Sequence, residues 1–189
     1  MKDVYIFTIG HGGRTIEEFF FLLRKYEINF LVDVRSSPYS KYYPDFNREN
    51  LKIISLQYQI KYVFMGDTLG GRPDDPTCYS SEKDKEGKSQ VLYNEIKKKD
   101  FFINSIERLV VANNKKIKIA CMCSELNPCD CHRSKLIGEV LYNKNISTYH
   151  IDEKGLLKSQ NEVINEITKG KNTISLFGDE VEFKSIGKY

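Results

Sequence analysis

The sequence has no long apolar run, no internal repeat and no long stretch of one charge. No segment approaches the roughly 18 consecutive apolar residues of a membrane-spanning helix. Strand-like residues follow Met1–Val4 directly, so we predict no signal peptide. The 12 glycines and 5 prolines are too few for long linkers or low-complexity segments. These absences predict a cytoplasmic protein with no membrane partner.

A chain of 189 residues with 40% hydrophobic and 29% charged residues has the size and the apolar content of one globular domain. We therefore predict a single domain over residues 1–189. The net charge of +3, from 29 basic and 26 acidic residues, is too balanced to indicate a nucleic-acid partner by itself. A local basic cleft stays an alternative, and nothing in the pattern specifies an oligomeric state.

Apolar strand-like runs alternate with segments of helical spacing along most of the chain. Thr15 and Glu18 have the spacing of a capping box, and Asn47 and Asp130 are candidate caps of later helices. Such alternation predicts an α/β protein, a three-layer α/β/α sandwich with a mostly parallel, Rossmann-like central sheet. The predicted strands are 4–9, 30–34, 61–64, 117–122 and 147–151, and helices are predicted at 15–26, from 47, near 101–110, after 130 and at 156–167.

Two regions depart from this alternation. The polar segment 72–90 is long for a loop within a compact domain, so we predict a mobile loop, with 80–88 as a lid. Residues 152–189 are predicted to form a C-terminal extension packed on the domain, ending in a hairpin around Gly178 and Asp179.

Polar residues follow three of the predicted strands where each one ends. Parallel strands direct their carboxyl ends to one edge of the sheet, where open α/β sheets bind ligands. We therefore expect these residues to share one cleft. They are Gly10 and His11, Asp33 and Arg35, and Cys123 and Glu125.

An anion site is predicted at this edge. Cys131, His132 and Arg133 begin a predicted helix, whose free N–H groups favour anions and lower the pKa of a cysteine. Arg35 and Arg133 would clamp a phosphate, and Gly10 would let the backbone approach it. The alternative is that Arg133 pairs with Glu125 inside the protein.

Several side chains near this site are candidates for catalysis. Either Cys123 or Cys131 would be the nucleophile if a base or a positive helix end activates its thiol. The general acid or base would be His11 or Glu125, and buried, inert thiols are the alternative. The full candidate set is His11, Asp33, Cys123, Glu125, Cys131 and His132.

Four of the five cysteines lie within eleven residues. No cofactor belongs to the leading hypothesis. The alternative is zinc or an iron–sulfur cluster, because four soft ligands in a small volume suit either group. The cysteines in question are Cys121, Cys123, Cys129 and Cys131.

The aromatic loop after Arg35 offers flat rings beside the predicted anion site. Tyr39 and Tyr42 would stack on a base of a nucleotide or of single-stranded nucleic acid. Packing of these rings on the domain surface is the alternative. The loop therefore adds a nucleic-acid-binding or regulatory module to the hypotheses.

The motifs Thr8-Ile-Gly-His11, Leu31-Val-Asp-Val-Arg35, Leu69-Gly-Gly71 and Cys123-x-Glu125-x5-Cys131-His-Arg133 together resemble the family called domain of unknown function 488. The resemblance covers roughly residues 4–143 and implies an α/β domain with no established activity. Cys121 and Cys129 are not part of the family pattern. The matching residues are His11, Asp33, Arg35, Gly70, Gly71, Cys123, Glu125, Cys131, His132 and Arg133.

The leading hypothesis is thus an enzyme, a hydrolase or a transferase, that binds a small phosphate-bearing or nucleotide-like ligand at the strand ends. The nucleic-acid-binding module and the metal protein are the two alternatives.

Overall fold

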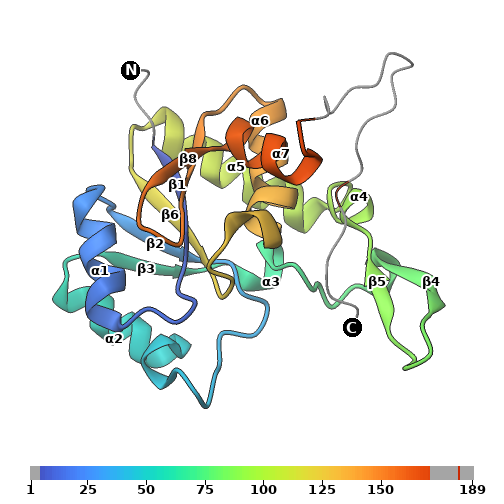
Figure 1. The fold of residues 1–189 in the computed structure, drawn as a ribbon, viewed down its shortest axis with the longest axis horizontal. Helices are drawn as coiled ribbons and strands as arrows, with labels where there is room; N and C mark the ends of the chain where they lie inside the picture. The colour runs from blue at the N-terminus through green and yellow to red at the C-terminus, as the bar shows by residue number, and fades with distance from the viewer. Residues whose placement is uncertain (1–4, 171–182, 184–189) are drawn as a thin grey trace.

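The computed structural model describes residues 5–170 and 183 (Figure 1). Its centre is a six-stranded sheet in the order β3-β2-β6-β1-β7-β8, in which only β8 runs antiparallel to its neighbour. The strands are β1 (Ile6–Gly10), β2 (Phe30–Asp33), β3 (Lys61–Phe64), β6 (Ile119–Cys123), β7 (Thr148–Ile151) and β8 (Leu157–Ser159). The prediction of a mostly parallel central sheet is confirmed.

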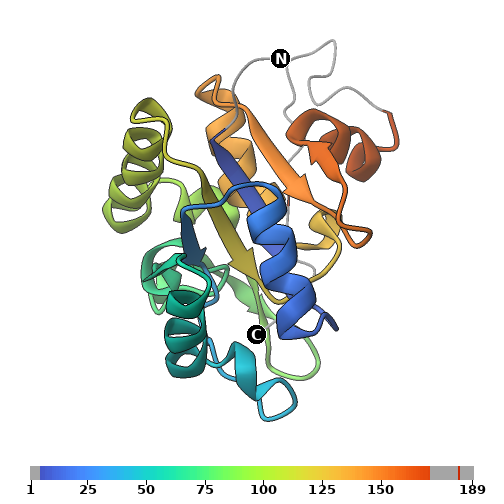
Figure 2. The same cartoon turned by 90° about the vertical axis from the view of Figure 1, so that its left-hand side faces the viewer.

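Helices cover both faces of this sheet (Figure 2). On one face, the buried side chains of α1 (Ile16–Lys25) and α2 (Arg48–Gln57) share an apolar cluster with Leu31 and Met122. On the other, α5 (Asp100–Asn114), the π-helix η4 (Arg133–Gly138), α6 (Glu139–Asn143) and α7 (Gln160–Thr168) share a second cluster with Val32 and Cys121. Because strand side chains alternate between faces, neighbouring strand residues enter different clusters. The three-layer α/β/α prediction is confirmed.

Shorter elements lie in the connections. They are the 3-10 turns η1 (Pro44–Phe46), η2 (Pro76–Cys78) and η3 (Pro128–Asp130), the one-turn helices α3 (Gly66–Leu69) and α4 (Tyr93–Ile96), and the two-stranded sheet of β4 (Tyr79–Lys83) and β5 (Ser89–Val91). Among the described residues, no helix has both the length and the apolar character needed to cross a bilayer.

Local sequence explains where the first helices begin. Thr15 caps α1, and both hydrogen bonds of the capping box with Glu18 are present. Asn47 precedes α2 as predicted, but its side chain accepts the Ser40 N–H at 2.6 Å and not a helix N–H. The side chain of Asn47 therefore holds the aromatic loop after Arg35 and does not cap the helix.

The order of the strands places the loops after β1 and β6 side by side. β1 lies between β6 and β7, and beyond the strands the N–H of His11 donates to Cys123 O at 3.0 Å. The N–H of Gly12 donates to Ser124 O at 2.9 Å. From β1 the chain continues toward β2 and β3, and from β6 it continues in the opposite direction across the sheet, toward β7. Open α/β sheets place ligands at such a change of strand order.

Three sequence-based expectations need correction or lie beyond the structure. Part of segment 72–90 is the antiparallel hairpin β4-β5, because backbone pairing gives this polar stretch its own regular structure; its mobility stays a prediction. Leu157–Ser159 pairs with β7 as strand β8, so the helix predicted from residue 156 begins only at Gln160. The hairpin predicted around residues 178–179 lies outside the described residues.

Candidate functional site

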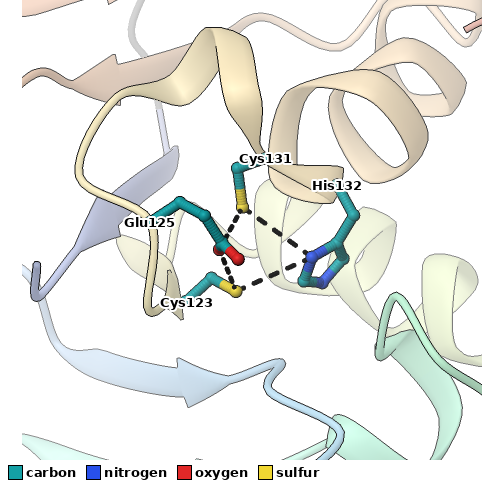
Figure 3. A group of neighbouring side chains, drawn as sticks. All are labelled: Cys123, Glu125, Cys131 and His132. Atoms are coloured by element: carbon teal, nitrogen blue, oxygen red, sulfur yellow. Dashed lines mark hydrogen bonds between the residues drawn. The ribbon is translucent and has the colours of Figure 1, made fainter. Parts of the chain in front are cut away.

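Four chemically reactive side chains converge beyond the end of β6 (Figure 3). One ligand atom from each of Cys123, Glu125, Cys131 and His132 lies within 4.8 Å of all the others. Oε2 of Glu125 accepts a hydrogen bond from Cys123 Sγ at 2.9 Å and lies 3.1 Å from Cys131 Sγ. Nδ1 of His132 lies 3.6 and 3.7 Å from the same two sulfurs. We call these four residues the thiol cluster.

The cluster is held by three consecutive pieces of backbone. Cys123 is the last residue of β6, and Glu125 follows it in an exposed loop. Asn127 caps the 3-10 turn η3 by accepting the Cys129 N–H, and Cys131 follows this turn. The spacing between the two cysteines is therefore taken up by one loop and one turn, which return the chain to the end of its own strand.

His132 is fixed in one orientation. Its Nε2 lies 3.2 Å from the backbone oxygen of Val34, at the end of β2. A carbonyl oxygen only accepts hydrogen bonds, so this contact places a ring proton on Nε2, and Nδ1 faces the two sulfurs. Gly71 packs on the ring, since a Cβ there would lie 3.0 Å from His132 Cγ.

Arg133 is completely buried beside the thiol cluster. Its Nε donates to Cys131 Sγ at 3.1 Å, Nη2 donates to Glu125 O at 2.6 Å, and Nη1 donates to Thr8 Oγ1 at 3.2 Å. Among the described residues, Arg133 forms no ion pair with a carboxylate. A buried cation needs a negative partner, and the sulfur of Cys131 is the group in contact that supplies one as a thiolate.

The electrostatics of the cluster agree with this assignment. Burial alone would raise the pKa of Cys131, but the hydrogen bond from Cys123 and the charges of Arg133 and His132 hold it well below its usual value. The pKa of Cys123 is raised well above its usual value by that same hydrogen bond and by burial. The pair therefore holds one proton on Cys123 and a negative charge on Cys131.

The second arginine of the predicted clamp is also engaged inside the protein. Arg35 donates from Nε and Nη2 to the two carboxylate oxygens of Asp33, at 2.9 and 2.6 Å. Its Nη2 also donates to Phe46 O, and Tyr62 donates its hydroxyl to Asp33 at 2.7 Å. Asp33 therefore holds Arg35 and Tyr62 in place, and the bidentate face of this guanidinium is occupied by a carboxylate of the chain itself.

His11 lies beside this ion pair in a largely apolar pocket. Its ring stacks on Phe46 with centroids 4.5 Å apart and meets the edge of Tyr43 at 5.8 Å. Its Nε2 lies 3.5 Å from Arg35 Nη1, and its buried Nδ1 has no hydrogen-bond partner among the described residues. Burial and then the charge of Arg35 lower the pKa of His11 to about 4, so the imidazole is neutral at pH 7.

The two histidines His11 and His150 make stability depend on pH. Burial, and then Arg133, lowers the pKa of His150 to about 4. Between pH 6.5 and 4 the unfolded chain binds more protons at these sites, so unfolding free energy falls as the pH drops through this window. We expect a loss of about 2 kcal/mol for each imidazole by pH 5.

NMR titration of the histidine ring protons measures the pKa of each imidazole in the folded protein. The signals can be assigned readily because the chain has only 3 histidines. The His11 and His150 signals should stay unshifted above about pH 5 in the folded protein. A midpoint near 6.5 for either ring would contradict the expectation for that residue.

Two of the four cysteines in the predicted metal set lie elsewhere. Cys121 is buried in the apolar cluster under α5, two residues before Cys123 on the same face of β6. Cys129 donates to Glu166 Oε2 on α7 at 3.3 Å. The side chains that gather with Cys123 and Cys131 are therefore Glu125 and His132, whereas Cys129 is directed to Glu166 on α7.

Residues that support the cluster were not singled out from the sequence. The hydroxyl of Thr8 joins Arg133 Nη1 to His150 Nδ1, at 3.2 and 2.7 Å. No local signal marks Thr8, since it is one residue in a β-branched strand. Only the adjacency of β1 and β6 brings it to the site.

The tyrosines proposed to stack on a ligand are exposed. The side chains of Tyr39 and Tyr42 are 73% and 76% accessible, and the ammonium of Lys41 lies over the Tyr42 ring. In the described part of the chain, no ring contact or hydrogen bond joins either tyrosine side chain to the thiol cluster. Stacking on a base stays a prediction.

Comparison with known proteins gives one match. The model of a family described as "Domain of unknown function DUF488" matches residues 15–140, which include the whole thiol cluster. No curated protein and no solved structure matches the chain.

Proposed function

Because the chain belongs to the DUF488 family, whose description names no reaction, we propose its function from the geometry: it is a zinc-binding protein. The ligands are Cys123, Cys131 and His132, with Glu125 completing the set. This proposal keeps the metal alternative of the sequence analysis and changes two of its four ligands.

The observation that carries the proposal is the distance between sulfur and nitrogen. Bonds of about 2.3 Å to sulfur and about 2.05 Å to nitrogen place the two ligand atoms about 3.6 Å apart in a tetrahedral zinc site. Nδ1 of His132 lies 3.6 Å from Cys123 Sγ and 3.7 Å from Cys131 Sγ. Both nitrogen–sulfur distances therefore match those between zinc ligands.

The surroundings of His132 support the same proposal. Histidines that bind metals usually donate their other ring N–H to a carboxylate or a backbone oxygen, which fixes the ring and its tautomer. The contact from Nε2 to Val34 O is of this kind. Nδ1, which faces the sulfurs, is consequently the nitrogen that would bind the metal.

The donor set favours zinc over other metals. Two thiolates and one imidazole suit zinc, whereas magnesium and calcium prefer oxygen ligands. Iron–sulfur clusters are usually held by four cysteines, and here Cys121 and Cys129 lie apart from the cluster. Zinc is therefore the metal that we propose.

The charges of the site also fit. Two thiolates neutralise Zn²⁺, and the buried charge of Arg133 then balances one further anion, which the Glu125 carboxylate supplies. The same contacts weaken the hypothesis of a phosphate clamp, because Arg35 and Arg133 already donate to acceptors of the chain. The ligand-binding enzyme is thus left without its two proposed cations.

Metal analysis of the purified protein tests the proposal. We expect about one zinc per chain in the wild type. Cys123→Ser or His132→Gln should lower zinc affinity at least about 100-fold, because each variant removes a residue that binds the metal directly. Cys129→Ser is the matched control and should keep the metal, since its thiol contacts Glu166.

Both ligand variants spare Cys131, the partner of Arg133, and should stay folded by circular dichroism. A wild type that binds no zinc in competition with a chromophoric chelator would overturn the proposal. Equal loss of zinc in Cys129→Ser would overturn the assignment of ligands.

A further inference from the structure

The thiol cluster has one accessible side. Cys123, Cys131 and His132 are 5%, 1% and 8% exposed, whereas Glu125 is classed as exposed and lies in a loop. Figure 3 shows the Glu125 carboxylate between the two sulfurs, approaching from the opposite side to His132. In the described part of the chain, the Glu125 side of the cluster is therefore the side nearest to solvent.

Glu125 is also held differently from the other three residues. The sulfur of Cys131 accepts from two nitrogens of Arg133, and His132 is fixed on Val34 O. By contrast, within the described residues the Glu125 carboxylate contacts only the cluster: it accepts a hydrogen bond from the Cys123 thiol and lies 3.1 Å from Cys131 Sγ. That hydrogen bond disappears when Cys123 loses its proton to a metal. Metal binding itself would release the Glu125 side chain.

The distances point the same way. The Glu125 oxygen lies 2.9 and 3.1 Å from the sulfurs, which is closer than the roughly 3.6 Å between oxygen and sulfur ligands of one tetrahedral zinc ion. The distances from the nitrogen to the two sulfurs match zinc ligand spacing, and the distances from the carboxylate oxygen do not. Glu125 must therefore move outward when a metal enters.

We propose that the zinc centre is catalytic and hydrolytic: Cys123, Cys131 and His132 are its permanent ligands, and Glu125 is a displaceable arm that leaves one coordination position open to water. This inference rests on the proposed zinc site and deepens it. Structural zinc sites have four protein ligands, whereas catalytic sites keep three and an exchangeable position.

The chemistry available at such a position is the activation of water. The water oxygen attacks an electrophilic carbon of the substrate, and the proton that it loses passes to the Glu125 carboxylate. The carboxylic acid then returns this proton to the leaving group, so the net reaction adds one water across the broken bond. Two thiolates, one imidazole and a nearby glutamate are also the set used by zinc deaminases that act on nucleobases.

The buried charge of Arg133 suits this exchange. With two thiolates on Zn²⁺, the guanidinium balances one more negative charge, and either the Glu125 carboxylate or a hydroxide provides it. The charge of the pocket is therefore unchanged when one replaces the other. Because the net charge stays the same, hydroxide can replace the Glu125 carboxylate on the metal without another charged side chain to balance it.

Cobalt substitution tests the inference without knowledge of the substrate. The thiolate-to-cobalt and d–d absorption bands of the Co²⁺ protein report on its ligands. Sodium azide is the probe, and we expect it to change the d–d bands in a saturable way. The variant Glu125→Gln should keep cobalt with an affinity within about tenfold of the wild type, because the three permanent ligands remain.

The matched control is Glu166→Gln, which alters another carboxylate beside a cysteine and should leave the bands and the azide response unchanged. A cobalt protein whose bands do not respond to azide, together with loss of cobalt from Glu125→Gln, would show a closed structural site and overturn the inference while the zinc proposal stands. Failure of the wild type to bind either metal would overturn both.

Discussion

Replacement of Arg133 by methionine is expected to lower the free energy of unfolding by about 3–5 kcal/mol, the range seen when one partner of a buried ion pair is removed. Arg133 is 0% exposed and donates to Cys131 Sγ, Thr8 Oγ1 and Glu125 O. Methionine fills part of the volume but donates nothing, so these acceptors lose their partner without gaining water. Urea unfolding of metal-free protein measures the difference.

A double-mutant cycle separates the ion pair from simple loss of packing. The single variants Arg133→Met and Cys131→Ala each leave a partner unpaired, whereas the double variant removes both charges. The double variant should therefore cost at least about 1 kcal/mol less than the sum of the two single variants. Arg108→Met, at an exposed position of α5, is the control and should change stability by less than about 0.5 kcal/mol. Strict additivity would contradict a thiolate at Cys131.

The second large effect is expected from Gly10→Ala. A Cβ at Gly10 would lie 1.9 Å from the backbone oxygen of Glu125 and 2.9 Å from Cα of Leu126. Neither atom belongs to a flexible side chain, so the loop that carries Glu125 must move away from β1. We expect a loss of about 3 kcal/mol in unfolding free energy, at the upper end of the range for overpacked sites.

This variant also tests whether the loop positions the metal ligands. Displacement of the Glu125 loop pulls on Cys123, whose carbonyl accepts the His11 N–H next to Gly10. Zinc affinity should therefore fall about tenfold or more, as for changes in the groups that orient metal ligands. Gly13→Ala is the control, because a Cβ there meets nothing within 4 Å. Equal stability and zinc affinity of the two variants would show that the close contact is unimportant.

Much of the fold could be predicted from the sequence because it depends on periodicity. Continuous apolar runs such as 30–34 indicate strands that are covered on both faces, and their alternation with amphipathic segments specifies a parallel sheet. The same dependence on apolar periodicity explains why hairpin β4-β5 could not be predicted. Its residues are polar and mostly exposed, so their pairing leaves no apolar pattern to detect.

The membership of the site could be predicted in part. Residues at the ends of parallel strands meet at one edge whatever their type, so Cys123, Glu125 and the Cys131-His132 pair could be assigned to one cleft. Their roles could not, because a pattern does not show which way a side chain points. Arg133 illustrates this limit: it was expected to face a ligand, but its guanidinium turns back to Thr8 on the neighbouring strand.

The central place of β1 has a consequence for how the protein forms. This strand is the first in the chain, yet its two neighbours are β6 and β7, which begin at Ile119 and Thr148. β1 cannot pair on either edge until more than a hundred further residues have left the ribosome. Contacts between such distant segments also form slowly. The centre of the sheet, and with it the thiol cluster at its edge, therefore cannot be completed before β7, which ends at Ile151, has been synthesised.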